Sequence, residues 1–185
     1  QYRHDANGSV IKVNHFQNTL NYAQKEPSGF RGLIIARNVE NETQYSTGSN
    51  EIVRIVPKGT DLVEGIGVII ASKNPRSLKD FYTKVLDFEC LTDRAAKCGN
   101  SVLFFEEGKG ATKTSTFVGE GFRYLTIQVF DADETCATIK SRGGRIAMEP
   151  ISVGKIARVG FVLDTDGNWI EISARTSLTG IPPKK

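Results

Sequence analysis

The hydrophobic positions of this chain follow first a strand pattern and then a helical one. Residues 65–71 form a dense run of Ile and Val, which is typical of a strand buried on both faces. A helix is predicted next, because Asn74 can cap it and Pro75 suits its first position. Its buried face has helical spacing and consists of Leu78, Phe81, Tyr82 and Val85. Strands at residues 88–92, 95–98 and 101–106 complete the order β-α-β-β-β.

The same order is predicted a second time between residues 124 and 172. Residues 124–130 alternate as a strand, and Asp131 with Glu134 forms a capping box for the following helix. Gly143 and Gly144 end that helix, and strands at 145–148 and 158–163 lead to a last strand. The predicted fold class is therefore α+β, with paired βαβββ modules. Their sheets curl into a mixed sheet around one shared cup, and helices cover the outside.

The last hairpin, residues 161–172, is the best-defined stretch of the second module. Asp166-Gly167 is a strong hairpin signal, since glycine accepts the positive φ of a tight turn. On the outgoing strand Trp169, Glu171 and Ser173 share one face, because side chains alternate along a strand. Glu171 is thus expected at a fixed depth on a rigid sheet.

Residues 1–60 are predicted to be an N-terminal β extension, and residues 61–178 the paired domain. Residues 5–13 have the same layout as 164–172, with Lys12 in the place of Glu171, and residues 48–56 are a looser echo. Two interpretations stay open: the end of a preceding module in a longer tandem protein, or a β extension that covers a sheet edge. Residues 14–29 are predicted to be loop and 31–37 a strand. The tail, residues 179–185, is predicted to be disordered.

Composition narrows the function classes. The chain has 185 residues and a net charge of +3, and its mild, scattered charge gives no reason to expect nucleic acid. No apolar run reaches membrane-spanning length, so no membrane partner is predicted. Cys90, Cys98 and Cys136 lack zinc spacing and are expected to be free thiols. A cytoplasmic location is predicted.

Three stretches together resemble the vicinal oxygen chelate superfamily, which includes glyoxalase I, extradiol dioxygenases and bleomycin resistance proteins. Residues 77–88 resemble the family's "FY…vLGF" helix end. Residues 129–131 leading to 141–144 are similar to its second helix and glycine pair. Residues 164–171 resemble its "DPDGN-x-IE" motif. The resemblance covers about residues 61–173 and implies the glyoxalase/bleomycin resistance fold.

The resemblance also implies where a metal would be bound. In metal-dependent members, a His or Gln and a Glu from each module supply four ligands, and the matching positions here are Gly65, Phe104, Tyr124 and Glu171. Only Glu171 is of a ligand type that such sites use. We therefore expect no metal and no other cofactor. The metal-dependent chemistry of glyoxalase I and of extradiol dioxygenases is disfavoured.

Glu171 and Tyr124 are the predicted catalytic candidates. A carboxylate facing an apolar cup suits a general base or an anchor for a polar ligand group. The alternative is a family relic, or a solvent-exposed edge residue paired with an arginine. The Tyr124 hydroxyl is suited to hydrogen bonding a ligand oxygen, and the alternative is a core aromatic residue.

Five further residues are predicted to contact a ligand. Trp169 and Phe104 would form apolar walls, and Thr126 and Gln128 fall on the Tyr124 face by alternation. Arg158 is placed to reach a ligand carboxylate, although solvated surface arginine is the default for that residue type.

Three functions remain in competition. The first is a metal-independent small-molecule-binding protein of the bleomycin resistance type, which holds a partly apolar ligand in the cup. The second is a metal-free isomerase, cyclase or lyase with Glu171 as base. The third is a structural or assembly module, with a homodimer or a missing N-terminal module as the partner.

Overall fold

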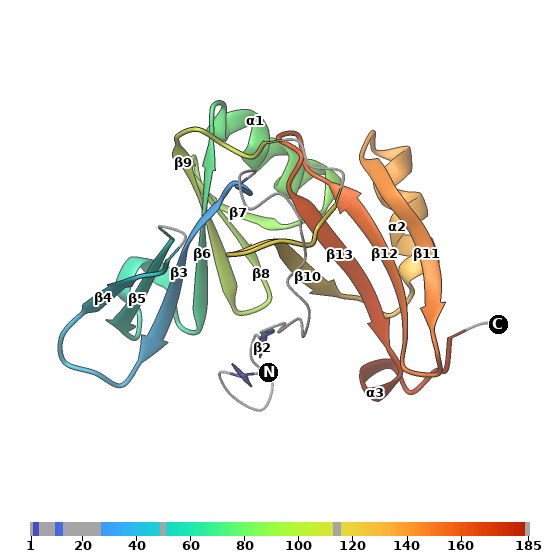
Figure 1. The fold of residues 1–185 in the computed structure, drawn as a ribbon, viewed down its shortest axis with the longest axis horizontal. Coiled ribbons are helices and arrows are strands. Elements are labelled where there is room, and N and C mark those ends of the chain that lie inside the picture. Colours follow the sequence, from blue (N-terminus) through green and yellow to red (C-terminus); the bar gives the residue numbers. More distant parts are fainter. Residues whose placement is uncertain (1, 4–9, 13–26, 49–50, 113–115, 184–185) are drawn as a thin grey trace.

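The computed structural model describes residues 2–3, 10–12, 27–48, 51–112 and 116–183. Figure 1 shows two curled sheets side by side, with α1 between them at one end and α2 packed behind β11 and β12 of the right-hand sheet. The larger sheet, called here the first sheet, has seven strands in the order β4-β5-β3-β6-β9-β8-β7. The second sheet has four strands in the order β10-β13-β12-β11. A separate antiparallel pair joins β1 (Tyr2–Arg3) and β2 (Val10–Ile11).

The first module supplies four strands and the first helix. Its elements are β6 (Ile66–Ser72), α1 (Pro75–Asp80), a π-helical turn η2 (Phe81–Val85), β7 (Glu89–Thr92), β8 (Ala95–Cys98) and β9 (Ser101–Glu107). β6 runs parallel to β9, and β8 is antiparallel to both of its neighbours, β9 and β7. The predicted β-α-β-β-β order is confirmed.

The second module repeats this arrangement. Its elements are β10 (Tyr124–Gln128), α2 (Ala132–Ser141), β11 (Arg145–Val153), β12 (Ala157–Leu163) and β13 (Trp169–Arg175), followed by a short helix α3 (Thr176–Thr179). β10 is parallel to β13, as β6 is to β9, and β12 is antiparallel to β13.

The N-terminal strands form a reduced copy of the same unit. They are β3 (Phe30–Arg37), β4 (Thr43–Ser46) and β5 (Ile52–Pro57), and a 3₁₀ turn η1 (Thr60–Leu62) follows. β3 is parallel to β5, and β4 is antiparallel to β5, so the order β3-β5-β4 matches the inner three strands of each module. The helix and the outermost strand are absent from this unit in the described part of the chain. The echo at residues 48–56 therefore falls on the β5 hairpin, whereas the echo at 5–13 lies mostly outside the described residues.

Local signals set the ends of the elements as expected. The Asn74 side chain accepts a hydrogen bond from the Ser77 amide at the start of α1, and Asp131 accepts one from the Glu134 amide at the start of α2. Gly143, with φ of 85°, ends α2 in the left-handed conformation. Gly167, with φ of 94°, forms the predicted turn before β13. None of the described helices is long and apolar enough to cross a membrane.

One core joins the two sheets. Leu78, Phe81 and Tyr82 of the first module pack with Ile139 of α2 and Ile172 of β13, and all are buried. The N-terminal unit also contacts the segment that precedes β10, because Glu51 accepts a hydrogen bond of 2.9 Å from the Phe122 amide. The helical face of each sheet is thus turned toward the shared core, and the opposite face is concave.

The expectation of a single cup shared by the two modules is corrected by the strand order. β3 occupies the edge of β6 through antiparallel pairing, so the first module shares its sheet with the N-terminal unit. The second module forms its own sheet. β3 of the N-terminal unit covers the edge of β6, as the interpretation of residues 1–60 as an edge-covering β extension had described.

Candidate functional site

The concave face of the second sheet brings together most of the predicted site residues. The parallel register of β10 and β13 places Tyr124 beside Trp169 and Thr126 beside Glu171. These four side chains lie on the face opposite α2, because Leu125, Ile127, Ile170 and Ile172 of the same strands pack into the core below the helix. The alternation argument is therefore confirmed for these four positions.

Glu171 is engaged by a residue from the N-terminal segment. The Lys12 ammonium donates a hydrogen bond of 2.6 Å to Glu171 Oε2, and the Thr126 hydroxyl donates one of 2.9 Å to the same oxygen. Glu171 is only 6% exposed. Lys12 Nζ also lies 4.8 Å from the centre of the Tyr124 ring, within the range of a cation–π contact. Both predicted catalytic side chains are thus in contact with one lysine.

Aromatic packing covers the rest of this face. Phe117, from the segment between the two modules, stacks on Phe161 with 4.4 Å between ring centres and 9° between planes. The same ring meets Tyr124 and Trp169 edge to face, at 5.5 Å and 5.7 Å. Such pairs stabilise beyond the area that they bury. The linker therefore contributes a side chain that packs where we had expected ligand.

Two predicted ligand contacts lie elsewhere, and a third, Gln128, lies on the same face but at its exposed end. Phe104 stands on β9 and packs in the first sheet, because the two modules do not share a cup. Arg158 forms a bidentate ion pair with Asp133 of α2, at 2.8 Å for each bond, so it faces the helix side. This pairing raises the pKa of the Arg158 guanidinium. Gln128 is exposed at the end of β10, beside Ser173.

The concave face of the first sheet contains a pocket of about 390 Å³. Its floor is apolar and consists of Ile34 of β3, Ile69 of β6, Ala95 of β8 and Phe104 of β9. Gly67 leaves room for the Phe104 ring on this floor. A Cβ at Gly67 would stand 3.1 Å from the edge of the Phe104 ring, which is closer than ordinary contact. The remaining lining residues are polar or lie at the rim: Arg54, Asp61, Leu62, Thr92, Arg94 and Glu106.

Two arginines at this pocket differ in their partners. Arg54 of β5 binds Glu42 through two bonds of 2.6 Å and 2.9 Å and Asp61 through one of 3.2 Å. The Arg54 guanidinium lowers the pKa of Glu42, and Glu42 in turn raises that of Arg54. Arg94 is exposed, and its side chain makes no hydrogen bond or ion pair to another described residue. Arg94 is therefore the pocket's available cation.

The four positions that match the family's metal ligands do not form a metal site. Glu171 and Tyr124 lie on the second sheet, Phe104 lies on the first, and Gly65 precedes β6 and offers no side chain. In the described part of the chain, no three His, Cys, Asp or Glu side chains group closely enough to hold a metal ion. One carboxylate, already bound to an ammonium, does not fit a divalent cation.

A buried polar network joining all three units was not predicted. The Tyr82 hydroxyl donates to Asp164 Oδ2 at 3.2 Å, and the Asn168 side-chain amide donates to the same oxygen at 2.8 Å. Asn168 Oδ1 accepts from the Gly29 amide of the N-terminal unit at 2.6 Å. Burial raises the pKa of the Asp164 carboxyl to about 6, against the opposing effect of its hydrogen bonds with Asn168. Residues 164–171, one of the three stretches that resemble the family, therefore link the two sheets through Asp164 and Asn168.

The cysteines are free thiols, as predicted. Cys136 is buried in the core below α2, and burial raises its pKa to about 11. Cys98 is half-buried, with a pKa raised by the same cause. A thiol that resists ionisation is a poor nucleophile.

Comparisons with known proteins agree with this architecture. The sequence profile of the Glyoxalase/Bleomycin resistance protein/Dioxygenase superfamily matches residues 65–172. A probable lactoylglutathione lyase of Vibrio parahaemolyticus is 33% identical over 110 residues, covering 52% of this chain and 79% of the relative. A probable lactoylglutathione lyase of Vibrio cholerae is 31% identical over 106 residues, covering 50% and 77%.

Solved structures with a related fold share little sequence with this chain. A glyoxalase/bleomycin resistance protein/dioxygenase family enzyme from Burkholderia phytofirmans is 15% identical, with a TM-score of 0.49, over 59% of this chain and 96% of that one. TioX from Micromonospora sp. ML1 is 19% identical, with a TM-score of 0.48, over 59% and 96%.

Proposed function

This chain belongs to the Glyoxalase/Bleomycin resistance protein/Dioxygenase superfamily, and on that premise we propose that it binds a small, partly apolar molecule in the pocket of the first sheet. The observation that carries the proposal is the pocket itself. It is concave, has an apolar floor, and is of a size typical of small-molecule sites.

The lining suggests the chemical class of the ligand. Phe104, Ile69 and Ile34 offer an apolar surface to an aromatic or aliphatic body. Arg94 stands at the rim with a guanidinium that can pair with a carboxylate or a sulfonate in bidentate fashion. A ligand with an apolar body and one anionic group satisfies both features.

Binding in this pocket requires no metal under the proposal. Of the positions that match the family's ligands, only Phe104 reaches the pocket, and its ring cannot coordinate a cation. Catalysis with Glu171 as base and Tyr124 as acid stays a prediction. Lys12 contacts both residues, and the Phe117 ring packs against Tyr124.

Titration with 8-anilinonaphthalene-1-sulfonate tests the proposal, since this probe combines an aromatic body with one sulfonate. We expect saturable binding that Phe104→Ala weakens and that Arg94→Gln weakens about tenfold, the size of one charge-assisted pair. Arg145→Gln is the matched control. Arg145 is an exposed arginine on β11 of the second sheet and should leave the affinity unchanged.

Two results would overturn the proposal. One is equal loss of affinity in Arg94→Gln and Arg145→Gln, which would mean general electrostatic attraction. The other is affinity that falls after extensive dialysis against EDTA and returns with a divalent metal.

A further inference from the structure

A second hollow lies on the helical side of the second sheet, and none of its lining residues lines the pocket of the first sheet. It has a volume of about 280 Å³ and is called here the helix groove. Its walls are η2 of the first module and α2 of the second, and its floor is apolar: Ile127, Val129, Ile139 and Ile172. Ile139 and Ile172 are buried and belong to the shared core. The helix groove is therefore an apolar hollow at the junction of the two modules.

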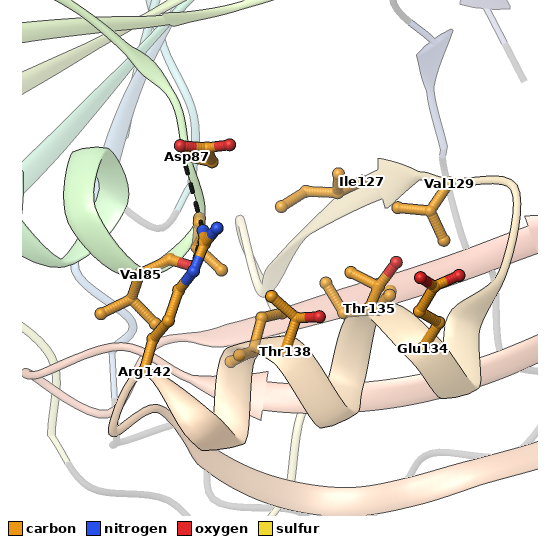
Figure 2. Close-up of a pocket in the computed structure, with 11 residues that line it drawn as sticks. Val85, Asp87, Ile127, Val129, Glu134, Thr135, Thr138 and Arg142 are labelled. Atoms are coloured by element: carbon orange, nitrogen blue, oxygen red, sulfur yellow. Dashed lines mark hydrogen bonds and ion pairs between the residues drawn. The ribbon is translucent and has the colours of Figure 1, made fainter.

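The α2 wall of the helix groove carries polar side chains. Glu134 and Thr138 are four residues apart, so they are neighbours on the helix surface, and Thr135 lies beside them. Figure 2 shows all three on the side of α2 that faces Ile127 and Val129. The Glu134 and Thr138 side chains make no hydrogen bond or ion pair to another described residue. Both are therefore available to a ligand.

The polar groups of this wall are mainly hydrogen-bond acceptors. The Thr135 hydroxyl donates its proton to the Asp131 carbonyl at 2.6 Å, so only its lone pairs remain for a ligand. An ionised carboxylate such as that of Glu134 accepts hydrogen bonds and has no proton to donate. A ligand group that donates several hydrogen bonds and carries positive charge suits this wall, whereas an anion does not.

The other end of the helix groove has a carboxylate that the family motif lacks. Asp87 stands where the FY…vLGF motif has glycine, and it adopts a left-handed φ of 64°. Glycine takes this conformation without steric cost, whereas aspartate does not. Arg142 Nη1 lies 3.9 Å from Asp87 Oδ1 and donates to the Val85 carbonyl at 3.3 Å, so it closes this end of the groove (Figure 2). Arg142 offsets the charge of Asp87, and the charge of Glu134 is not offset by another lining residue.

We propose that the helix groove binds an organic cation, namely a primary amine on a compact apolar body. The ammonium group pairs with the Glu134 carboxylate and donates to the hydroxyls of Thr135 and Thr138. The apolar body covers Ile127 and Val129. The volume lies at the lower end of the range for small-molecule sites, which limits the body to about one aromatic ring with a short arm. This site is additional to the pocket of the first sheet and does not depend on it.

Titration with phenethylamine tests the proposal on the full 185-residue chain. In ¹⁵N-labelled protein we expect saturable amide shifts at Ile127, Val129 and Thr138. Glu134→Gln should weaken binding about tenfold, the size of one charge-assisted pair, and glutamine is also suited to the first turn of a helix. Glu89→Gln is the matched control. Glu89 is an exposed glutamate on β7 outside the groove, so this variant should leave the affinity unchanged.

Two relatives of the probe separate charge from apolar contact. 2-Phenylethanol keeps the ring and the arm but has no charge, and 3-phenylpropanoate reverses the sign of the charge. Both should bind about tenfold more weakly than phenethylamine or less tightly still. Glu134→Gln should not weaken the binding of the alcohol. Thr138→Val, which removes a hydroxyl and keeps the shape of the side chain, should weaken the binding of the amine several-fold.

Four results would each overturn the proposal. Equal weakening in Glu134→Gln and Glu89→Gln would mean general electrostatic attraction. An alcohol that binds as tightly as the amine, or a titration without saturable shifts, would mean that the groove does not recognise a cation. Amine binding that weakens as the protein concentration rises would assign the groove to a second copy of the chain.

Competition with 8-anilinonaphthalene-1-sulfonate separates this site from the pocket of the first sheet. Phenethylamine should not displace that probe, and the probe should not alter the affinity for the amine. Displacement would place the amine in the pocket of the first sheet and overturn the helix groove as its site. Loss of probe binding in Arg94→Gln with unchanged amine binding would support two separate sites, so the two proposals can fail independently.

Discussion

The two sheets contain modules of the same βαβββ order, but their concave faces are covered by different parts of the chain. In the first sheet, the N-terminal unit extends the module at β6, and a pocket of about 390 Å³ remains over Phe104 and Ile69. In the second sheet, β10 lacks such an extension among the described residues, and Phe117 packs onto the face with Lys12 beside it.

The difference shows that the pocket of this protein is built by two units that share one sheet. The pocket of the first sheet is lined by Ile34 of the N-terminal unit as well as by Ile69 and Phe104 of the first module, whereas Phe117 packs on the face of the four-stranded second sheet. Three added strands change that outcome in the first sheet. The position of the candidate site therefore follows from which edge is extended, and only secondarily from which residues stand on the last strand.

The largest expected effect comes from removing the side chain on which both sheets depend. Tyr82 is fully buried in the shared core, so Tyr82→Ala should destabilise the protein by about 3–5 kcal/mol. Tyr82→Phe should cost only about 1 kcal/mol, because it loses the bond to Asp164 alone. Urea unfolding followed by Trp169 fluorescence and by circular dichroism should give coincident transitions.

Whether the fluorescence and circular dichroism transitions coincide tests whether the two sheets unfold together. Trp169 reports on the second sheet, and circular dichroism reports on both. If the Trp169 transition of Tyr82→Ala stayed at the wild-type urea concentration, the two sheets would be independent, and the shared core would have to be abandoned.

A somewhat smaller effect is expected from the carboxyl group that links the units. The folded pKa of Asp164 is about 6, above the usual value near 4, so the folded state holds a proton that the unfolded state releases. Stability from this group is therefore greatest below about pH 4 and falls as the pH rises to 6, by at most about 3 kcal/mol. The asparagine side chain of Asp164→Asn cannot ionise, so this variant should not lose stability between pH 4 and pH 6 through this position.

The test is the difference in unfolding free energy between wild type and Asp164→Asn at pH 4 and at pH 7. We expect the unfolding free energy of Asp164→Asn, relative to that of the wild type, to increase as the pH rises. A difference that does not change with pH would mean that Asp164 ionises normally in the folded protein.

Opening the second face should have a moderate effect. Phe117→Ala removes the ring stacked on Phe161 and should cost about 1–2 kcal/mol. Acrylamide should then quench Trp169 more strongly, since the Phe117 ring no longer packs against it. Probe affinity at the first sheet should not change. Unaltered quenching would show that Phe117 does not protect this face.

The smallest effect is expected from the ion pair on the second face. Lys12→Met keeps the apolar stem but removes the ammonium that binds Glu171, and the Lys12 side chain is 20% exposed. A double-mutant cycle with Glu171→Gln should give a coupling of about 1 kcal/mol, reduced by salt. A coupling of zero would mean that Lys12 and Glu171 are not paired in solution.

Local structure could be predicted from the sequence because local chemistry determines it. The caps at Asn74 and Asp131 and the turn at Gly167 rest on residues within a few positions of one another. Alternation along β10 and β13 was enough to place Tyr124, Thr126, Trp169 and Glu171 on one face. These predictions needed no knowledge of distant contacts.

Edge pairing could not be predicted in the same way. Several strands could hydrogen bond to the edge of β6, and the choice depends on how the complete sheets pack. Placing Phe104 in the same cup as Glu171 assumed that the two modules share one cup, whereas β3 of the N-terminal unit pairs with β6. The echo at residues 48–56 was the available signal, since it marks β5 as the last strand of another unit.

Chemical-shift mapping tests the central claim most directly, which is that the open cup lies on the first sheet. In ¹⁵N-labelled protein titrated with 8-anilinonaphthalene-1-sulfonate, we predict the largest amide shifts at Ile34, Ile69 and Phe104. The amide signals of Thr126, Trp169 and Glu171 should not shift. Saturable shifts centred on those three residues of the second sheet, with the first sheet unaffected, would contradict the account.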